Sequence, residues 1–424
     1  MTEFNLQEYC RDVAARAKRA SRALAALSGG QKNQWLETVA TMLVDRAELI
    51  LAENAKDLAA AREAGLKPSM IDRLTLTRKT LEGMAQALRE IAAFPDPIGE
   101  TISSSIRPSG LEVRKVRAPL GVVFFVYESR PNVTTDAAAI CVKSGNAVIL
   151  RGGKEAIHSN IVLGKILADA AEATGLPKDA AQLLTTTDRN AIDEFLHMPE
   201  YVNVAIPRGG EALVKRVATE AKMPVIKHFA GNCHVYVDPS ADPEVAERVL
   251  LNSKMQRLGT CNTAESLVLH SQIAPSLAQR LLKALSEKGC ALRVDERARK
   301  LVGDAVQVEA ATEQDFYAEY LAAIISVKVV DSLEEAIAHI NEHSSGHTEA
   351  IISQDVRAIK RFTTEIDSAA VMVNASTRLH DGGQFGLGAE IGISTDKFHA
   401  RGPCGVNELT SYKYVVYGDG ALRE

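Results

Sequence analysis

The sequence predicts an α/β fold in which helices cover both faces of a mostly parallel sheet. From Gly121 onward, short apolar runs alternate with longer amphipathic stretches, and this alternation is typical of βαβ units. Some of these runs end in a glycine pair just before the next helical stretch, which is where open α/β sheets bind ligands. With 424 residues, the chain is long enough for two or three domains.

Composition and charge argue against several classes of protein. The 54 acidic and 49 basic residues give a net charge of −5, which provides no electrostatic footprint for nucleic acid. No apolar run approaches the ~18 residues of a membrane span. The six cysteines are scattered without a C-x-x-C pair, which favours reduced thiols over a disulfide framework. We therefore expect a soluble cytoplasmic enzyme that binds neither nucleic acid nor a membrane.

The first hundred residues predict helices, and the segment after them predicts a hairpin. Amphipathic stretches indicate helices over residues 5–27, 31–65 and 76–94. Two alternating runs, 102–107 and 111–116, flank a Pro-Ser-Gly turn and indicate a β-hairpin. Its charged strands suit an arm that pairs with a partner chain, and the closing run 410–417 would complete the same sheet.

The remaining strands and helices follow the alternation. Strands are predicted over residues 121–126, 147–150, 202–206, 235–237, 267–270, 324–330, 350–353 and 371–374. Helices are predicted over residues 131–143, 155–174, 243–254 and 331–341. The later strands indicate a second α/β half.

Cys261 lies in the stretch around which the rest of the chain is organised. This stretch, Arg257 to Ser266, falls between a predicted helix and a predicted strand, and it places Cys261 in a tight loop beside Gly259. Small polar neighbours suit a reactive thiol, although a half-buried structural cysteine fits the same pattern. A thiol near its ordinary pKa of ~8.5 needs nearby cations or dipoles to become a nucleophile.

Two glycine pairs are candidate dinucleotide-binding turns, although the sequence has neither G-x-G-x-x-G nor G-x-x-x-x-G-K-[ST]. The first comprises Arg151, Gly152, Gly153 and Lys154, and the second comprises Pro207, Arg208, Gly209 and Gly210. Backbone N–H groups at the second would suit a pyrophosphate, and the two cations of the first would suit a 2′-phosphate. Taken alone, ordinary strand-to-helix turns are the simpler interpretation of both.

A competing motif predicts a zinc-dependent hydrolase. His339, Glu342 and His343 match H-x-x-E-H, and the first two histidines of this region would share one helix face. A solvated helix end with histidines near its C-terminal dipole explains the pattern equally well. Cys233 and His234 are another candidate pair, but adjacent residues on a strand point to opposite faces and cannot readily interact.

The motifs, taken in order along nearly the whole chain, closely resemble one enzyme family. They are Gly121–Val123, Tyr127–Asn132, Ser144–Glu155, Ile206–Gly210, Gly231–Asp238, Cys261–Asn262, Ala336–Glu349, Asn374–Arg378 and Asp381–Gly392. The family resembled is that of the γ-glutamyl phosphate reductases, or glutamate-5-semialdehyde dehydrogenases, the proline-biosynthesis branch of the aldehyde dehydrogenase superfamily. The resemblance makes the histidine pattern a family signature, with no metal.

The resemblance implies a Rossmann-type cofactor domain, an α/β catalytic domain and a β-hairpin oligomerisation arm. We assign residues 1–100 and 118–235 to the cofactor-binding domain and residues 236–400 to the catalytic domain. Residues 101–117 and 405–424 are assigned to the arm. A homo-oligomer is the expected assembly.

The resemblance also implies a mechanism in which Cys261 is the nucleophile. Its thiolate would attack the acyl phosphate of L-glutamate 5-phosphate, and NADPH would reduce the resulting thioester to the semialdehyde. The Cys261 backbone N–H, with Asn262 or a polar group near Ser129, would stabilise the oxyanion. Contact with the glutamate kinase that makes the labile substrate is a further expectation.

Departures from the superfamily refine these expectations. Ordinary aldehyde dehydrogenases carry a Glu-Leu-Gly-Gly segment whose glutamate activates water, and here the matching segment begins with His228, which disfavours hydrolysis of the thioester. Lys154 replaces an acidic residue that can hold the ribose of NAD, so NADP is favoured. Glu319 resembles the glutamate that holds the nicotinamide ribose. Arg130 and Arg378 are candidates for binding the substrate α-carboxylate.

Overall fold

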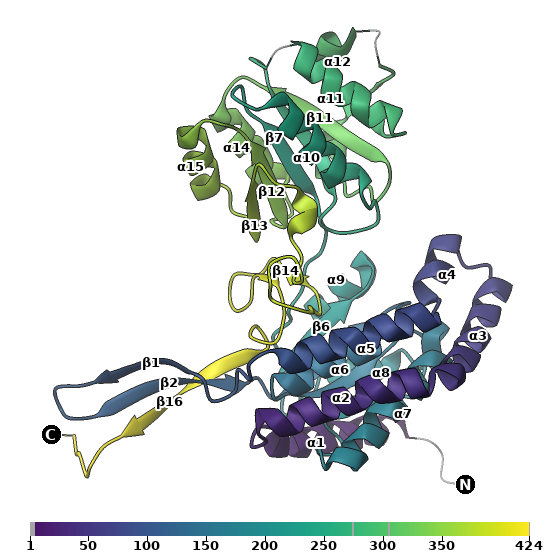
Figure 1. The fold of residues 1–424 in the computed structure, drawn as a ribbon, viewed down its shortest axis with the longest axis vertical. Helices are drawn as coiled ribbons and strands as arrows, with labels where there is room; N and C mark the ends of the chain where they lie inside the picture. The colour runs from purple at the N-terminus through teal and green to yellow at the C-terminus, as the bar shows by residue number, and fades with distance from the viewer. Residues whose placement is uncertain (1–4, 274, 304–305, 424) are drawn as a thin grey trace. The chain divides into compact units, whose positions relative to one another are not determined.

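Two units are built from interrupted stretches of the chain (Figure 1). A computed structural model describes residues 5–273, 275–303 and 306–423, so residues 1–4 and 424 of the expected domains lie outside the described residues. Unit 1 comprises residues Met1–Lys227, Gly386–Gly392 and Pro403–Glu424, and unit 2 comprises His228–Phe385 and Ile393–Gly402. Residues 228–235, expected in the cofactor-binding domain, belong to unit 2, because β7 (Cys233–Val237) pairs with strands of that unit. The functional role of each unit stays a prediction.

Unit 1 contains a four-stranded parallel sheet in the order β5-β4-β3-β6. Its strands are β3 (Val122–Tyr127), β4 (Ala147–Arg151), β5 (Ala181–Leu183) and β6 (Val204–Arg208). Val122, Phe124 and Val126 alternate toward a core shared with the first helix, while Val123 and Phe125 are equally buried on the other face. The expected parallel sheet with two covered faces is confirmed.

The helices of unit 1 surround this sheet. They are α1 (Leu6–Leu24), α2 (Gly29–Asp45), α3 (Ala47–Glu63), α4 (Pro68–Leu74), α5 (Arg78–Ala93), α6 (Asn132–Lys143), α7 (Ile157–Thr174), α8 (Asn190–Leu196) and α9 (Glu211–Glu220). The helix expected over residues 31–65 is two helices, because the backbone of Arg46 leaves the helical region and ends α2. The α4 helix, which begins with Pro68 in its first turn, was not predicted.

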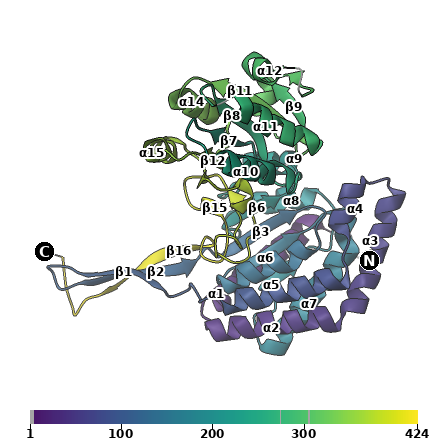
Figure 2. The same cartoon turned by 45° about the horizontal axis from the view of Figure 1, so that its top comes forward.

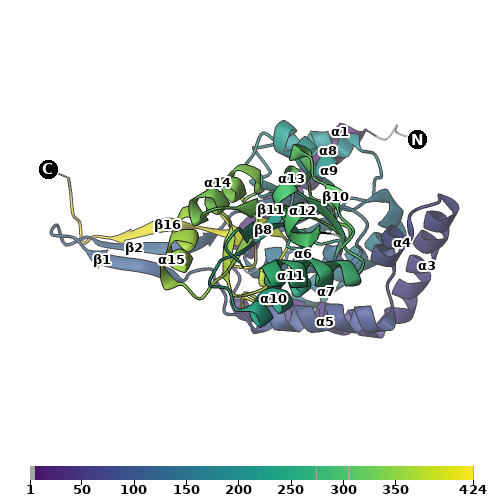
Figure 3. The same ribbon diagram turned by 90° about the horizontal axis from the view of Figure 1, so that it is seen from above.

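A separate three-stranded antiparallel sheet confirms the expected hairpin. It has the order β1-β2-β16, with β1 (Thr101–Ile106), β2 (Glu112–Pro119) and β16 (Thr410–Tyr417). Figure 1, Figure 2 and Figure 3 show it extending away from the helices of unit 1 as an arm. All of β1 is exposed, and β16 exposes Tyr412 and Tyr414. Its role in oligomerisation stays a prediction.

Unit 2 contains a seven-stranded parallel sheet in the order β10-β9-β11-β8-β7-β12-β13. Besides β7, its strands are β8 (Ala264–His270), β9 (Ala291–Val294), β10 (Glu309–Ala310), β11 (Ile324–Val330), β12 (Thr348–Ile352) and β13 (Ala370–Val373). Val235 and Val237 pack with helices on one face, whereas Tyr236 and Val268 pack with other helices on the opposite face. Both faces are therefore buried, as expected for a parallel sheet.

The helices of unit 2 lie on these two faces. The first core includes α10 (Pro243–Met255), α11 (Pro275–Glu287) and α12 (Glu296–Val302), and the second includes α14 (Leu333–His343) and α15 (Val356–Glu365). Shorter elements are α13 (Glu313–Tyr317), the 3-10 helices Lys154–Ala156 and Thr377–Leu379, and the strands β14 (Ile393–Ser394) and β15 (Gly402–Pro403). Within the described ranges, no helix has both the length and the apolar character needed to cross a membrane.

Candidate active site

Cys261 occupies the loop between α10 and β8, as the sequence predicts. The loop is anchored beneath by a fully buried ion pair in which Lys254, on α10, donates to Glu265, on β8. Glu265 also accepts from the backbone N–H of Leu321 at 3.1 Å. Burial raises the pKa of Glu265 to about 7, and Lys254 opposes that rise. The ion pair fixes both ends of the loop and leaves Cys261 partly exposed.

Gly231 allows the segment before β7 to approach the nucleophile loop. A Cβ atom at Gly231 would lie 1.9 Å from the carbonyl oxygen of Cys261, so only glycine fits without a backbone shift. The Gly231 N–H donates to Glu319 at 2.9 Å, and the Cys233 thiol donates to the Cys261 carbonyl at 3.2 Å. The backbone of Cys261 is thus held from two sides. Glu319 serves here as a backbone acceptor, and its role toward a cofactor ribose stays a prediction.

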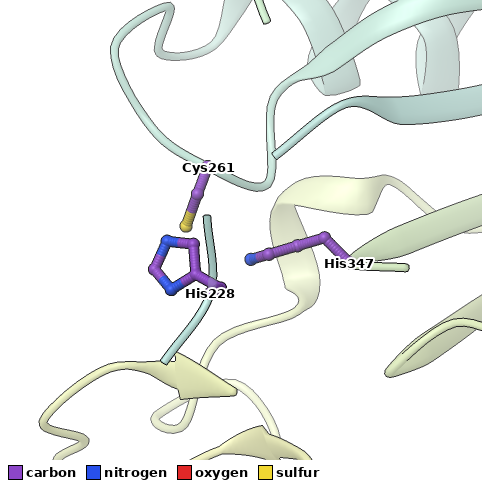
Figure 4. Close-up of side chains that lie close together, drawn as sticks. All are labelled: His228, Cys261 and His347. Carbon is purple, nitrogen blue, oxygen red and sulfur yellow. The ribbon is translucent and has the colours of Figure 1, made fainter. Parts of the chain in front are cut away.

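Two histidines meet the Cys261 thiol (Figure 4). One ligand-type atom from each of His228, Cys261 and His347 lies within 4.8 Å of the others. The Nδ1 atom of His228 is 2.8 Å from the carbonyl oxygen of Ile393, so Nδ1 carries a hydrogen and Nε2 presents a lone pair in the neutral ring. The site therefore combines a sulfur nucleophile with imidazole groups that can exchange its proton.

His347 is fully buried at one end of a chain of polar groups. Its Nδ1 lies 2.6 Å from the hydroxyl of Thr348, which lies 2.7 Å from Nδ1 of His380. Burial, followed by the neighbouring His228 and His380, lowers the pKa of His347 well below its ordinary value. Burial also lowers the pKa of His380 to about 4. Both rings are neutral at neutral pH, and Nε2 of His347 has no partner among the described residues.

The Asn262 side chain is anchored to the 378–380 backbone. Its amide nitrogen donates to the carbonyl oxygens of His380 at 3.0 Å and Arg378 at 3.5 Å, and the residue is buried. Its expected role toward an oxyanion stays a prediction. The backbone N–H of Cys261 stays the candidate donor.

The two arginines expected to bind substrate lie in different units. Arg378 belongs to unit 2, where its Nε donates to Gln256 at 2.9 Å. Burial, followed by the charge of Arg257, lowers the pKa of Arg378, and the charge of a Cys261 thiolate raises it. The expected role of Arg378 toward the substrate stays a prediction. Arg130 belongs to unit 1, and its role toward a substrate stays a prediction.

Unit 1 contains a cavity of about 550 Å³ at the carboxyl ends of its parallel strands. The lining includes the ends of β3 and β4, with Arg151, Gly153 and Lys154, and residues of α9. Arg151 is 7% exposed, and its Nε has no partner among the described residues. A Cβ at Gly152 would lie 2.1 Å from Asn160, so this turn is built for close backbone packing. The sequence-predicted residues of the first glycine pair therefore lie at a ligand-sized cavity.

Two carboxylates occupy the polar positions of this cavity. Glu128 accepts from the Gly210 N–H at 2.8 Å, at the N-terminus of α9. Glu155 accepts from both the N–H and the hydroxyl of Ser129 at 2.7 Å, and the expected role of Ser129 near an oxyanion stays a prediction. A Cβ atom at Gly209 would lie 2.4 Å from a carboxylate oxygen of Glu128, so Gly209 also packs closely against Glu128. The Gly210 N–H thus already donates to an anionic group, as it would in a pyrophosphate site.

The four residues of the second glycine pair are not among those that line this cavity. Pro207 is paired with Val126 in the sheet, and Arg208 donates to the carbonyl of Ile391. In this structure Pro207 and Arg208 make structural contacts. Their expected role in cofactor binding stays a prediction.

The H-x-x-E-H pattern does not converge on a metal site. His343 uses both ring nitrogens, with Nδ1 2.8 Å from the His339 carbonyl and Nε2 2.8 Å from Glu313. Glu342 accepts from the hydroxyl of Tyr317 at 3.0 Å. Across the described ranges, the group of three residues that could hold a metal is His228, Cys261 and His347. The hydrolase interpretation thus lacks its ligand set.

Comparison with known proteins identifies the family. The model of the aldehyde dehydrogenase family matches residues 5–300 and 305–415. The chain belongs to the aldehyde dehydrogenase family. Within this family, it is 55% identical over 419 residues to the gamma-glutamyl phosphate reductase of Rhodopirellula baltica, covering 99% of this chain and 96% of that protein. It is 50% identical over 412 residues to the gamma-glutamyl phosphate reductase of Carboxydothermus hydrogenoformans, covering 97% and 99%.

A solved structure within this aldehyde dehydrogenase family agrees. The crystal structure of gamma-glutamyl phosphate reductase from Thermotoga maritima has a TM-score of 0.96 and 42% identity, covering 98% of this chain and 100% of that chain. The expected aldehyde dehydrogenase-like fold and the resemblance to this branch are both confirmed.

The sequence alone did not predict that His228 and His347 lie beside Cys261. His228 was noted as the residue that replaces an aldehyde dehydrogenase glutamate, and His347 lies within the Ala336–Glu349 motif. The signal that could have found them is their position: His347 directly precedes β12, and His228 lies in the segment before β7. Both strands belong to the sheet whose strand β8 follows the Cys261 loop. Cys233 and His234 do point apart, as predicted, because His234 pairs with Glu349 at 2.9 Å.

Proposed function

We propose that this aldehyde dehydrogenase family member reduces L-glutamate 5-phosphate to L-glutamate 5-semialdehyde and phosphate, using NADPH, in proline biosynthesis. The relatives at 50% and 55% identity carry the name of this activity over almost the whole chain. The observation that carries the chemistry is the partly exposed Cys261 thiol beside His228 and His347. Acyl transfer to sulfur requires such a nucleophile with a proton acceptor in reach.

The first step forms a thioester at Cys261. An imidazole lone pair accepts the thiol proton, and the sulfur attacks the acyl carbon of the substrate. The new C–S bond replaces the bond from carbon to the phosphate oxygen, whose electron pair leaves with phosphate. The same imidazole returns the proton to the departing phosphate. Because burial lowers the pKa of His347, its ring is a poor proton acceptor, and Thr348 holds that ring in place.

The second step consumes the thioester. When bound, NADPH supplies the hydride that the reduction requires. The Cys261 backbone N–H stabilises the oxyanion on the former carbonyl, and collapse of that oxyanion breaks the C–S bond. The sulfur recovers its proton through the neighbouring imidazoles. His228 stands where ordinary aldehyde dehydrogenases have a water-activating glutamate, and this replacement favours the aldehyde over a free acid.

Unit 1 fits a phosphorylated dinucleotide. The unpartnered Nε of buried Arg151 and the exposed ammonium of Lys154 suit a 2′-phosphate, and the Gly210 N–H suits the pyrophosphate. Glu128 would have to leave the Gly210 N–H for that phosphate to take its place. Glu319 would hold the nicotinamide ribose.

Arg378 would bind the substrate α-carboxylate, with Arg130 as a second candidate. The arm formed by β1, β2 and β16 would join copies of the chain, because its exposed strand edges can extend a partner's sheet. We also propose that the enzyme contacts a glutamate kinase and that it is located in the cytoplasm.

The reverse reaction tests this proposal. Cofactor reduction would be followed with glutamate 5-semialdehyde and NADP⁺, with and without phosphate, for the wild type, Cys261→Ser and the buried-thiol control Cys290→Ser. We expect phosphate-dependent reduction in the wild type and Cys290→Ser, and loss of it in Cys261→Ser. Reduction without phosphate would mean that water resolves the thioester, and the assigned reaction would be wrong.

A further inference from the structure

The cluster at Cys261 has a donor set that the reductase reaction does not require. Two imidazole nitrogens and one thiolate sulfur are the ligands that zinc selects in proteins. We propose that His228, Cys261 and His347 form a reversible Zn²⁺ site, and that the bound ion inhibits the enzyme by capturing the nucleophile. The inhibition rests on the proposed function of Cys261, whereas the binding of zinc does not.

The spacing of the three donors fits a site that closes on the ion. The donor atoms lie within 4.8 Å of one another. Zinc places nitrogen at about 2.0–2.1 Å and sulfur at about 2.3 Å, which requires donors roughly 3.5 Å apart in a tetrahedron. The donors must therefore approach by about 1 Å. His228 and Cys261 are only partly buried, so rotation of their side chains would supply this movement while the Cys261 backbone stays held. Buried His347 provides the fixed ligand.

Groups behind the two histidines orient them as zinc ligands. Metal-binding histidines almost always direct the second ring nitrogen to a carboxylate, a backbone carbonyl or water, which orients the ring. His228 directs Nδ1 to the carbonyl of Ile393 at 2.8 Å, and His347 directs Nδ1 to Thr348 at 2.6 Å. Nε2 of His347 is completely buried and has no partner within the described part of the chain. Figure 4 shows both rings beside the sulfur.

The chemistry of the sulfur explains how a bound ion would inhibit the enzyme. Cys261 binds as the thiolate, and the ion replaces the thiol proton that the imidazoles would otherwise accept. The new Zn–S bond uses the electron pair with which Cys261 would attack the acyl phosphate. Three protein ligands leave one coordination position for water, as in open zinc sites, but here the ion sits on the nucleophile.

The H-x-x-E-H segment offers no equivalent site. Both ring nitrogens of His343 are engaged, and Glu342 accepts from Tyr317. Burial lowers the pKa of His339 to about 3, and its ring packs edge-on against Phe316. His339 therefore serves as a buried control residue whose loss should leave zinc binding intact.

Direct zinc binding tests the proposal. The full-length protein would compete with a chromophoric chelator for Zn²⁺ alone, without substrate or cofactor, in the wild type, His228→Ala, His347→Ala and Cys261→Ser. We expect one ion per wild-type chain and a more than tenfold weaker affinity in each variant. His339→Phe and the exposed-histidine variant His197→Ala should retain wild-type affinity. Zinc should also slow alkylation of Cys261 by iodoacetamide more than tenfold in the wild type, and EDTA should reverse this.

The outcomes separate this proposal from the proposed function. Unchanged affinity in His228→Ala and Cys261→Ser would overturn the site, as would zinc that increases activity. Because buried His347→Ala can unfold the chain, thermal unfolding accompanies each titration, and His228→Gln on the exposed side supplies an independent ligand removal. If zinc binds through these residues while the reductase assay fails, the site stands and the proposed reaction does not. If phosphate-dependent activity is present but unaffected by saturating zinc, the inhibitory role is wrong.

Discussion

Gly231 lies so close to Cys261 that a methyl group on it would overlap the Cys261 carbonyl oxygen, at 1.9 Å. We predict that Gly231→Ala shifts the nucleophile loop, lowers kcat/KM at least about 100-fold and lowers the free energy of unfolding by roughly 1–3 kcal/mol. Steady-state kinetics and urea unfolding would measure both. The control is Gly83→Ala on α5, where a Cβ meets no atom within 4 Å. It should retain activity and gain roughly 0.5–1 kcal/mol.

Cys261 should be the thiol that reacts first with iodoacetamide in the folded protein. The other five cysteines are buried. Burial raises the pKa of Cys10 to about 12 and that of Cys290 to about 11, which leaves almost no thiolate at pH 7.5. Mass mapping after brief alkylation should find more than about 90% of the label on Cys261. Equal labelling of a second cysteine would contradict the buried state assigned to it.

Lys154→Glu should shift the cofactor preference from NADPH toward NADH. The new carboxylate would repel a 2′-phosphate and accept hydrogen bonds from ribose hydroxyls, so the ratio of the two kcat/KM values should change at least about tenfold. Parallel kinetics with both cofactors would measure it. Lys165→Glu, an exposed charge reversal on α7, should leave the ratio unchanged. A constant ratio in Lys154→Glu would remove Lys154 from the cofactor site.

Arg378→Gln should raise KM for glutamate 5-semialdehyde in the reverse reaction by about 10- to 100-fold, because a charge-assisted contact to the α-carboxylate is lost. The same variant assayed with an aldehyde that lacks this carboxylate should differ little from the wild type. Loss of rate with both aldehydes would instead indicate that Arg378 acts through the charge of Cys261, which raises the pKa of Arg378.

His339 should make the protein less stable in acid. Burial lowers its pKa to about 3, whereas an unfolded histidine titrates near its ordinary pKa of 6.5. Its stabilising contribution is complete above pH 6.5 and is lost as pH falls from 6.5 toward 3, at up to about 1.4 kcal/mol per pH unit. Urea unfolding between pH 7.5 and 5 should show a shallower loss for His339→Phe than for the wild type. If the free energy of unfolding fell equally with pH in both proteins, His339 would bind its proton equally well in the folded and unfolded states, and the prediction would be wrong.

Local patterns predicted the elements that depend on local chemistry. The tight loop of Cys261 and the hairpin of β1 and β2 followed from turn residues and from alternating runs. The pairing of β16 with the hairpin was also predicted, from the closing run 410–417 that would complete its sheet. The break at Arg46 could not be predicted, since its neighbours are good helix formers and the chain must turn there to pack α3 against α7.

The site depended on contacts that no local pattern encodes. His228 and His347 are far apart in sequence and meet Cys261 only because β7, β8 and β12 are neighbours in one sheet. Asn262 was expected to stabilise an oxyanion because it adjoins the nucleophile. Its amide donates to the 378–380 backbone, a segment whose approach depends on tertiary structure.

Unit 1 cannot be completed until the ribosome has synthesised β16, because β16 pairs with β2. Arg117, at the end of β2, donates to Thr410, which follows it by 293 residues, and buried Asn146 donates to the carbonyl of Leu409. At roughly 5–20 residues per second, the edge of β2 waits about 15–60 s for β16. During this delay, the Arg114 and Lys115 charges oppose pairing with nascent strands of other chains. The charges of this arm therefore oppose aggregation of the protein while it is being synthesised.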